Sequence, residues 1–427
     1  MVPGGFPVVG HMPAVAVDAL GFMRDAERQC GQLYYWNAGF GAWQLTYASR
    51  EAIALFRNKV TDSEYLRERP GFGRFFGESL LVHDGPVHQH MRSAMNGPFQ
   101  PRGLTEGRVG EIVADLVGRY ARRWVGRRDV RVLADTRELA LEVMFRLVGV
   151  DDAEMAAWRV HYEDLVLLLV NIPVNVPGSP HYRGSKARAW IDEQLRREVV
   201  KARAKADAPG LLPGLLASRD ENGAPLTDEE LIDNLRLLFL AGHETSASTM
   251  AWMVAHLAER PDVWRRLRDE ARAAPGLPRS PKELRQFPYA EAVFRETLRL
   301  HPPVISDARR ATTDFEIEGR PVKRGTLLNV PILSLSRDPE LYPDPDAFRP
   351  ERWLDKKEPP TPMEMVQFAA GPHFCLGYHL AWMEIVAFAA AIGRELSAGG
   401  PRLSGGFPAS RYVPILHPAA SMQVSFD

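Results

Sequence analysis

Apolar residues recur at helical spacing along much of the chain, and the longest such segment begins at Thr227. Thr227 and Glu230 form a capping box, which is typical of a helix N-terminus. Apolar positions then repeat at a helical period until Pro261, which predicts one helix of about thirty residues, roughly 45 Å long. Because this segment is apolar around most of its circumference, we expect the helix to run through the core.

Shorter helices and two hairpins complete the predicted elements. Helices are predicted over 262–274, 289–300 and 376–396, and the last is apolar on nearly every side, which indicates burial. The segment 33–47 is rich in Tyr, Trp, Leu and Thr around two glycines, and apolar and acidic residues alternate from Phe315 onward. Both patterns are typical of β-hairpins. The sequence therefore predicts a mainly α fold with minor β sheets.

Composition narrows the classes of protein that fit this pattern. No repeat or low-complexity linker divides the chain, so we expect residues 1–427 to form a single domain. The 53 basic and 54 acidic side chains give a net charge of -1, which disfavours binding to nucleic acid or to an anionic membrane.

Location in the cell is indicated by the cysteines and by the apolar runs. Cys30 and Cys375 are too few for a disulfide framework and fit a reducing compartment. Residues 1–12 lack the features of a signal peptide, and the apolar run 165–176 is too short to span a bilayer. We therefore expect a soluble, cytoplasmic protein, most simply a monomer.

Cys375 stands directly before the predicted helix 376–396. Free backbone N–H groups and the positive end of the helix dipole stabilise a thiolate at such a position. Gly371 and Gly377 lie four residues before and two residues after Cys375, where they would let a flat ligand approach the backbone. A buried structural role is the commoner one for a lone cysteine, and these residues alone leave both roles open.

The whole segment around Cys375 closely resembles the cysteine-ligand loop of the cytochrome P450 family. That family's pattern is Phe, two spacers, Gly, a spacer, Arg or His, a spacer, Cys, a spacer and Gly. The sequence matches it at Phe368, Gly371, His373, Cys375 and Gly377. Many members have Gly where this chain has Ala369. The resemblance implies a cytochrome P450 fold, haem b as the cofactor and Cys375 as its iron ligand, and an axial thiolate favours cleavage of the O–O bond.

Two further segments match the family in order along the chain. Glu296 and Arg299 share one helical face, and alone they would be an ordinary surface ion pair. The family has Glu-x-x-Arg at this place, together with a later Phe-x-Pro-x-Arg segment that matches Phe348, Pro350 and Arg352. The resemblance implies that Glu296, Arg299 and Arg352 form the structural triad that holds the ligand loop.

The long predicted helix carries an acid beside an alcohol, Glu244 and Thr245, after Ala241 and Gly242. Gly242 costs about 1 kcal/mol within a helix, which suggests a close approach or a local opening of the helix. Taken alone, the two residues are better explained as a back-bonded threonine beside a plain ion pair. The string also resembles the family's oxygen-binding groove, which implies that Thr245 and Glu244 relay protons for oxygen activation and that Ala241 faces the substrate. His243 is given no catalytic role.

Several basic residues resemble the groups that bind the haem propionates in this family. His88 and Arg92 are four apart on a predicted helix, although an isolated pair of this kind is often solvated. Arg309 is a further candidate for this role, and Arg310 is its lower-ranked rival. His373, two residues before Cys375, also resembles a propionate-binding group of the family; a surface histidine is the alternative.

The resemblance further implies how the enzyme works. We expect a monooxygenase that inserts one oxygen atom from O2 into a lipophilic terpenoid, polyketide, steroid or fatty acid of bacterial specialised metabolism. Electrons would come from NAD(P)H through a ferredoxin reductase and a ferredoxin, because two cysteines cannot hold a cluster. The segments 63–80 and 154–207 correspond to mobile access elements; within them the apolar run that starts at Leu165 fits either a lid or a core helix.

Three other functions would fit parts of the same sequence. A peroxygenase of the same fold would use peroxide directly and often lacks the acid–alcohol pair. A non-enzymatic carrier of haem or of a hydrophobic ligand would need no proton relay. Glu244 and Thr245 disfavour both rivals, whereas an isomerase or dehydratase that needs no external electrons stays open.

Overall fold

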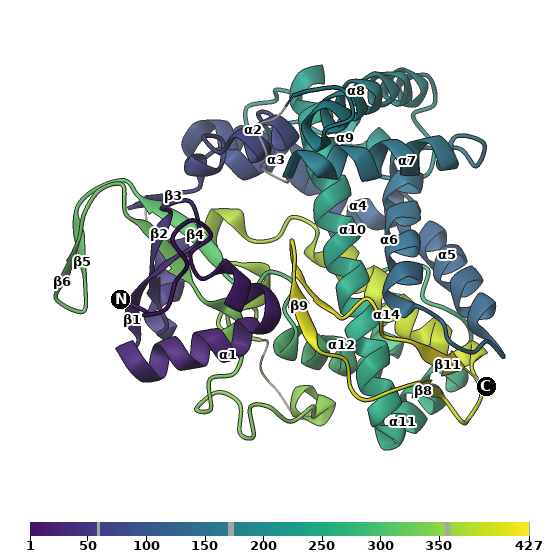
Figure 1. The fold of residues 1–427 in the computed structure, drawn as a ribbon. Helices are drawn as coiled ribbons and strands as arrows, with labels where there is room; N and C mark the ends of the chain where they lie inside the picture. Colours follow the sequence, from purple (N-terminus) through teal and green to yellow (C-terminus); the bar gives the residue numbers. More distant parts are fainter. Residues whose placement is uncertain (58–59, 170–174, 355–357, 359, 427) are drawn as a thin grey trace.

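The computed structural model describes residues 1–426 apart from 58–59, 170–174, 355–357 and 359. Most of the described chain is helical (Figure 1). The helices are α1 Met12–Cys30, α2 Pro70–Phe76, α3 Gly85–Phe99, α4 Pro101–Glu106, α5 Val109–Trp124, α6 Val132–Val148, α7 Met155–Val166, α8 Pro180–Ala204, α9 Leu212–Ala217, α10 Asp228–Glu259, α11 Pro261–Ala273, α12 Pro288–Leu300, α13 Ile332–Leu335 and α14 Tyr378–Glu395.

The strands form small sheets, as predicted. They are β1 Leu33–Asn37, β2 Trp43–Tyr47, β3 Thr61–Asp62, β4 Asp307–Ala311, β5 Phe315–Ile317, β6 Arg320–Val322, β7 Leu327–Val330, β8 Pro401–Leu403, β9 Ser410–Tyr412, β10 Leu416–Pro418 and β11 Val424–Phe426. Both predicted hairpins are confirmed: β1 pairs with β2, and β5 pairs with β6, each in antiparallel register. The largest sheet has the order β1-β2-β7-β4-β3 and lies with α1 on one side of the helical body (Figure 1).

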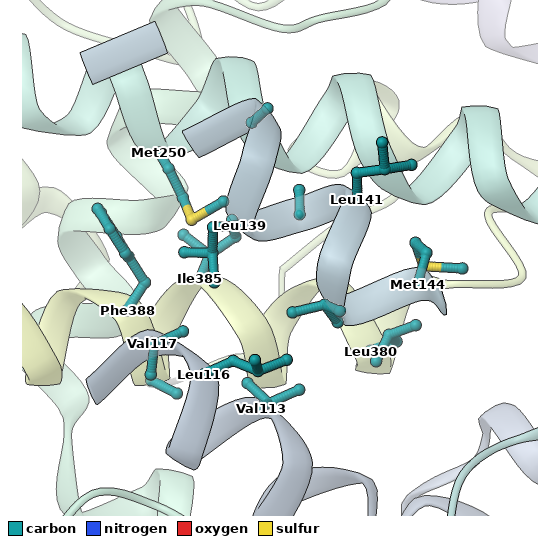
Figure 2. Close-up of a cluster of buried hydrophobic side chains, with 14 of the residues drawn as sticks. Val113, Leu116, Val117, Leu139, Leu141, Met144, Met250, Leu380, Ile385 and Phe388 are labelled. Atoms are coloured by element: carbon teal, nitrogen blue, oxygen red, sulfur yellow. The ribbon is translucent and has the colours of Figure 1, made fainter. Parts of the chain in front are cut away.

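The long helix α10 crosses the helical body and confirms the predicted core helix. Its capping box is present, since the Thr227 hydroxyl accepts from the Glu230 N–H at 3.3 Å and the Glu230 carboxylate accepts from the Thr227 N–H at 2.8 Å. The helices α6 and α14 pack against it, and α5 packs against both of these, with buried apolar side chains between them (Figure 2). The central contributors are Val113, Leu116, Val117, Leu139, Leu141, Met144, Met250, Leu380, Ile385 and Phe388.

The helix after the cysteine begins later than its apolar pattern suggests. α14 starts at Tyr378, two residues after the predicted start, because Cys375 and Leu376 belong to a turn that leads into it. The Tyr378 N–H reaches back to the Cys375 carbonyl at 3.4 Å. Burial of α14 on nearly all sides is confirmed. The cysteine therefore lies just ahead of a helix fixed in the core.

The apolar run 165–176 lies where α7 ends. A short 3-10 turn, Leu167–Leu169, follows α7 and contacts both α2 and α8, and Leu168 is buried there. Residues 170–174 of the run lie outside the described residues. Within the described chain, none of the helices combines the length and the apolar character that crossing a bilayer requires.

Candidate active site

A cavity of about 340 Å³ lies between α10 and the loop that carries Cys375. Helix α10 forms one wall, the loop and α14 form the opposite wall, and α3 and β4 contribute to the rim. Most of the residues predicted for the site border this cavity, namely His88, Arg92, Ala241, Thr245, Arg309, Phe368, His373, Cys375 and Gly377. Residues from four distant parts of the sequence therefore meet at one place.

Cys375 is held by the backbone of its own loop. Its N–H donates to the Phe368 carbonyl at 2.8 Å, which closes the loop on itself. Burial raises the pKa of the Cys375 thiol, while the Gly377 backbone and the Arg92 charge oppose that rise. A bound metal ion deprotonates such a thiol outright. The position therefore favours a thiolate only as a ligand of a cation.

The glycines of the loop serve different purposes. Gly371 has a φ of +67°, and a Cβ there would lie 2.3 Å from the Phe56 carbonyl, so the protein's own backbone already requires glycine at this position. At Gly377 a Cβ would meet nothing within 4 Å, and this residue borders the cavity. Room for a flat ligand thus exists at Gly377.

Ala369 occupies a backbone conformation that suits glycine. Its φ is 60° and its ψ is -162°, a region that residues with a Cβ rarely adopt. Its side chain packs against the hydrophobic cluster under the five-stranded sheet. The departure from the usual glycine of the family therefore places strain in the loop.

Basic side chains gather at the rim of the cavity on α3, β4 and the cysteine loop. Arg309 is 3 % exposed and its nearest carboxylate is Asp307, with Nε and Oδ2 3.3 Å apart. Arg92 donates to the Phe374 carbonyl at 2.6 Å, and among the described residues no carboxylate pairs with it. Arg310, the second-ranked candidate, instead bonds Glu68 and Asp62 and does not appear among the described residues that line the cavity.

Two histidines complete this basic rim. His88 is buried, its Nε2 has no hydrogen-bond partner among the described residues, and burial lowers its pKa to about 4. The His88 and His373 rings lie 4.1 Å apart. The unpartnered nitrogen beside Arg92 and Arg309 fits an anionic group of a ligand. The residues present therefore fit a flat group that carries carboxylates.

Sequence reasoning missed the partner of His373. The His373 Nε2 lies 2.9 Å from Asp84 Oδ1, and the Ser63 N–H and hydroxyl donate to the other oxygen of Asp84 at 2.7 and 2.8 Å. Burial alone would raise the pKa of Asp84, but the bonds from His373 and Ser63 bring it down to about 2. Asp84 stands just before α3, and nothing in the local sequence links it to a loop nearly three hundred residues later.

The acid and the alcohol of α10 point to different surroundings. Thr245 borders the cavity and donates to the Ala241 carbonyl at 2.6 Å. Glu244 accepts from Arg137 of α6, at 2.9 Å from Nη2 and 3.2 Å from Nε, and is not among the described residues that line the cavity. Thr245 thus forms the backbone hydrogen bond, and Glu244 the ion pair, that the sequence left as alternatives to the relay.

Gly242 is explained by helix packing. A Cβ at this position would lie 2.5 Å from the Met144 sulfur of α6, so glycine permits the close approach of the two helices. His243, on the same turn, is buried against α7, where its Nδ1 lies 3.2 Å from the Tyr162 hydroxyl, and burial lowers its pKa to about 4. A close approach, of α6 to α10, is thus what Gly242 allows.

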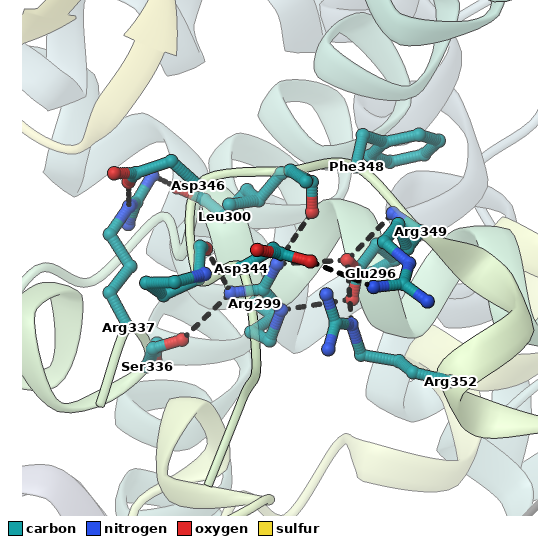
Figure 3. A network of polar contacts seen from close by, with 12 residues as sticks. Glu296, Arg299, Leu300, Ser336, Arg337, Asp344, Asp346, Phe348, Arg349 and Arg352 are labelled. Carbon is teal, nitrogen blue, oxygen red and sulfur yellow. Dashed lines mark hydrogen bonds and ion pairs between the residues drawn. The ribbon is translucent and has the colours of Figure 1, made fainter. Parts of the chain in front are cut away.

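Glu296, Arg299 and Arg352 meet in a network of buried polar contacts (Figure 3). The Glu296 carboxylate accepts from Arg299 at 2.8 and 2.9 Å and from Arg352 Nε at 3.0 Å. The Trp353 indole and the Arg349 N–H, which the sequence did not suggest, also donate to it at 2.9 Å. Arg299 then binds three backbone carbonyls, of Ser336, Pro345 and Ala347.

Comparison with known proteins identifies the family of this chain. The family model described as Cytochrome P450 matches residues 2–397. The chain belongs to the cytochrome P450 family. A protein named Cytochrome P450 BJ-4, from Bradyrhizobium diazoefficiens, is 39% identical over 100% of this chain and 96% of its own length. The 7,8-epoxymelianol synthase CYP88A154 of Ailanthus altissima is 30% identical over 73% of this chain and 65% of its own length.

A solved structure shows the same fold. The retinoic acid-bound cyanobacterial CYP120A1 superposes with a TM-score of 0.82 at 24% identity, covering 99% of this chain and 97% of that one. The mainly α cytochrome P450 fold expected from the sequence is thus confirmed, and the chain is a cytochrome P450 monooxygenase with haem as the family's cofactor.

Proposed function

We propose that this cytochrome P450 inserts one oxygen atom of O2 into a C–H or C=C bond of a lipophilic small molecule, in bacterial specialised metabolism. The observation that carries the proposal is the cavity itself, with Cys375 on one wall and Thr245 on the other. The reaction consumes two electrons and two protons and releases one water. Haem b, when bound, supplies the iron chemistry that activates O2.

The chain's residues would hold that group from three sides. Cys375 would provide the thiolate ligand, and Arg92, Arg309, His88 and His373 would bind the propionates as the basic rim of the cavity. Arg92, which has no carboxylate partner among the described residues, and His88, whose Nε2 is unpaired there, are best suited to this, because charge-assisted hydrogen bonds to carboxylates are strong in an enclosed site. Phe368 and Gly377 would line the face of the ring, and the Glu296 network would keep the loop in place.

Proton supply is assigned to Thr245 and Glu244. The Thr245 hydroxyl lies at the cavity wall, where it can donate to a water or pass a proton onward. Glu244 lies on the same helical turn with its carboxylate on Arg137, whose side chain is 33% exposed. This arrangement gives the carboxylate a link toward solvent and leaves Thr245 as the group that faces the reaction.

The substrate class is inferred from the apolar side of the cavity. Leucines from the segments on either side of α2 and from α10 border it together with Val304, and apolar pockets with a few polar groups bind lipophilic ligands. The residues are Leu66, Leu80, Leu81, Leu237 and Leu238. The name of the Ailanthus relative contains an epoxide, which fits oxygen transfer to a C=C bond as one of the two outcomes.

Electron supply and location complete the proposal. Two cysteines, one of them at the site, leave no ligands for an iron–sulfur cluster. We therefore infer that NAD(P)H electrons arrive through a ferredoxin reductase and a ferredoxin. The protein would act as a soluble, cytoplasmic monomer of one domain.

The proposal is tested by spectroscopy followed by turnover. The reduced carbonyl complex of the haem-loaded protein should show the red-shifted Soret band of thiolate ligation, and Cys375→His should lose that band while still binding haem. Retention of the band in Cys375→His would reject Cys375 as the ligand. Turnover of a lipophilic compound that displaces the iron-bound water should need reduced ferredoxin; turnover supported by peroxide alone would instead establish the peroxygenase.

A further inference from the structure

The first turn of the chain and the β1–β2 hairpin meet at the outer edge of the largest sheet, where β1 is the edge strand and the N-terminus lies beside it (Figure 1). Two hydrogen bonds between Phe6 and Gly10, at 2.9 and 3.0 Å, close the first turn. The Phe40 N–H of the hairpin donates to the Val8 carbonyl at 2.6 Å, which joins the two turns. We call residues 6–10 and 38–43 together the N-terminal tip.

Large apolar side chains of the N-terminal tip are left in water. Phe40 is 80% exposed, and Phe6, Val8, Val9 and Trp43 are exposed as well. Phe40 holds a φ of 51° between two glycines that also have positive φ, a conformation that bulky residues rarely adopt. The hairpin therefore accepts a strained backbone at the position where it presents an aromatic ring to solvent.

The N-terminal tip and the chain around it lack charged side chains. Residues 1–17 and 29–49 contain no Asp, Glu, Lys or Arg, although these four types make up 25% of the whole chain. An exposed apolar patch marks a surface that binds a protein or a membrane. Because charged side chains carry most of the cost of entering an apolar layer, this surface can enter one cheaply.

The size of the N-terminal tip favours a lipid layer over a second copy of the chain. A stable protein interface takes about 20–30 residues on each side, whereas the tip consists of two short turns that project from the edge of a sheet. A narrow apolar projection of this kind can enter the headgroup layer of a bilayer, where Trp and other apolar side chains are favoured. The absence of charge matches lipids that carry no net charge.

We propose that the N-terminal tip inserts into the surface of a bilayer of lipids without net charge, with Phe40 as the side chain that enters deepest. Phe6, Val8 and Trp43 contact the headgroup layer around it. One small apolar anchor gives weak, reversible binding, so the protein is free in water between contacts. This contact goes beyond the proposed oxygenase function and does not depend on it.

The first test measures sedimentation of the haem-loaded, full-length protein with phosphatidylcholine vesicles. The bound fraction should rise with lipid concentration and stay constant between about 0.05 and 1 M NaCl, because salt weakens only contacts between charges. Phe40→Asn should lower the partition coefficient at least about tenfold, since Asn tolerates a positive φ but lacks the apolar ring. Failure of the parent protein to bind, or binding that needs anionic lipid and is lost in salt, would overturn the proposal.

Two exposed valines provide a matched comparison. Val8 is 58% exposed in the N-terminal tip, and Val200 is 66% exposed on α8. Val8→Ser should lower the partition coefficient severalfold, because it removes apolar surface from the contact, whereas Val200→Ser should leave it unchanged. Equal effects of the two substitutions would show that the tip is not the surface that binds lipid.

Fluorescence then locates the contact in the molecule. Vesicles with brominated acyl chains should quench part of the tryptophan emission of the parent protein and less of that of Trp43→Phe, which keeps an apolar ring in the tip. Quenching that does not change in Trp43→Phe would contradict insertion of the tip. Each variant is used only if its reduced carbonyl complex keeps the thiolate Soret band of the parent, which verifies the fold.

Self-association is measured by sedimentation equilibrium without lipid. A dimer of the parent protein that Phe40→Asn abolishes, together with no binding to vesicles, would assign the N-terminal tip to a second copy and overturn the proposal. A monomer that binds vesicles through the tip supports it. None of these measurements involves turnover, so they decide the lipid contact whether or not the oxygenase proposal holds.

Discussion

The strained residue of the cysteine loop gives a prediction of unusual sign, namely that a glycine should stabilise the protein. Ala369 holds a φ of 60° and a ψ of -162°, which costs a residue with a Cβ about 1–3 kcal/mol. Replacing it with glycine removes that cost. Against this gain stand about 0.4–1 kcal/mol of additional chain entropy in the unfolded state and about 0.4 kcal/mol for half-burial of one methyl group.

The expected result is that Ala369→Gly raises the free energy of unfolding by about 1 kcal/mol. Ala370→Gly is the matched control, because Ala370 has an extended backbone with a φ of -154° and a buried methyl group. That variant gains nothing from relief of strain and should lose about 1–2 kcal/mol.

The assay must resolve a small difference in a long chain. At about 2.1 cal/mol/K of unfolding entropy per residue, 1 kcal/mol moves the Tm of 427 residues by only about 1 °C. Paired urea titrations of the haem-loaded proteins, followed by circular dichroism and by the thiolate Soret band, are therefore the better measure. If Ala369→Gly destabilises the protein as much as Ala370→Gly does, the conformational argument is refuted.

Three further predictions follow from buried polar groups. Glu296→Gln should destabilise the protein by about 3–5 kcal/mol by leaving Arg299 unpaired, measured as a lower urea midpoint, whereas an unchanged midpoint would show the network to be dispensable. Thr245→Ala should keep the thiolate Soret band but release peroxide in place of product; unchanged coupling would remove Thr245 from the relay. His256 and His301 are buried in contact, with Nε2 atoms 3.0 Å apart and pKa values lowered by burial, that of His256 to about 3. As the pH falls, these histidines take up protons in the unfolded state before they do so in the folded state, so the free energy of unfolding should decrease below about pH 6.5. His256→Phe should make that pH dependence shallower, measured by urea titrations across pH.

Local patterns in the sequence predicted the elements well because their causes are local. The capping box at Thr227 and the alternation at Phe315 both formed as expected, since each depends on neighbours within a few residues. The predicted start of α14 is two residues too early because Leu376 extends the apolar pattern back into the turn between Cys375 and Tyr378. An apolar pattern reports burial, and burial does not distinguish a turn from a helix.

Side-chain partners were less predictable because they come from distant segments. Gly371 is required by the Phe56 carbonyl, Asp84 reaches His373, and Arg137 of α6 draws Glu244 away from the cavity. No spacing in the sequence reports such contacts.

The Glu296 network and the polar groups at the cavity rim differ in how fully their hydrogen bonds are satisfied, and this difference separates a structural role from ligand binding. Both oxygens of Glu296 meet donors of the chain itself, so the acid is fully paired and its effect is on stability, while Arg352 Nη2 is left without a partner among the described residues. At the cavity rim, the His88 nitrogen has no partner among the described residues and Arg92 binds only a backbone carbonyl. Because buried polar groups are normally satisfied, the incomplete cluster is the one suited to receive an anionic ligand. Substitutions at the rim should therefore leave folding intact and lower the affinity for haem, whereas substitutions in the Glu296 network should destabilise the fold.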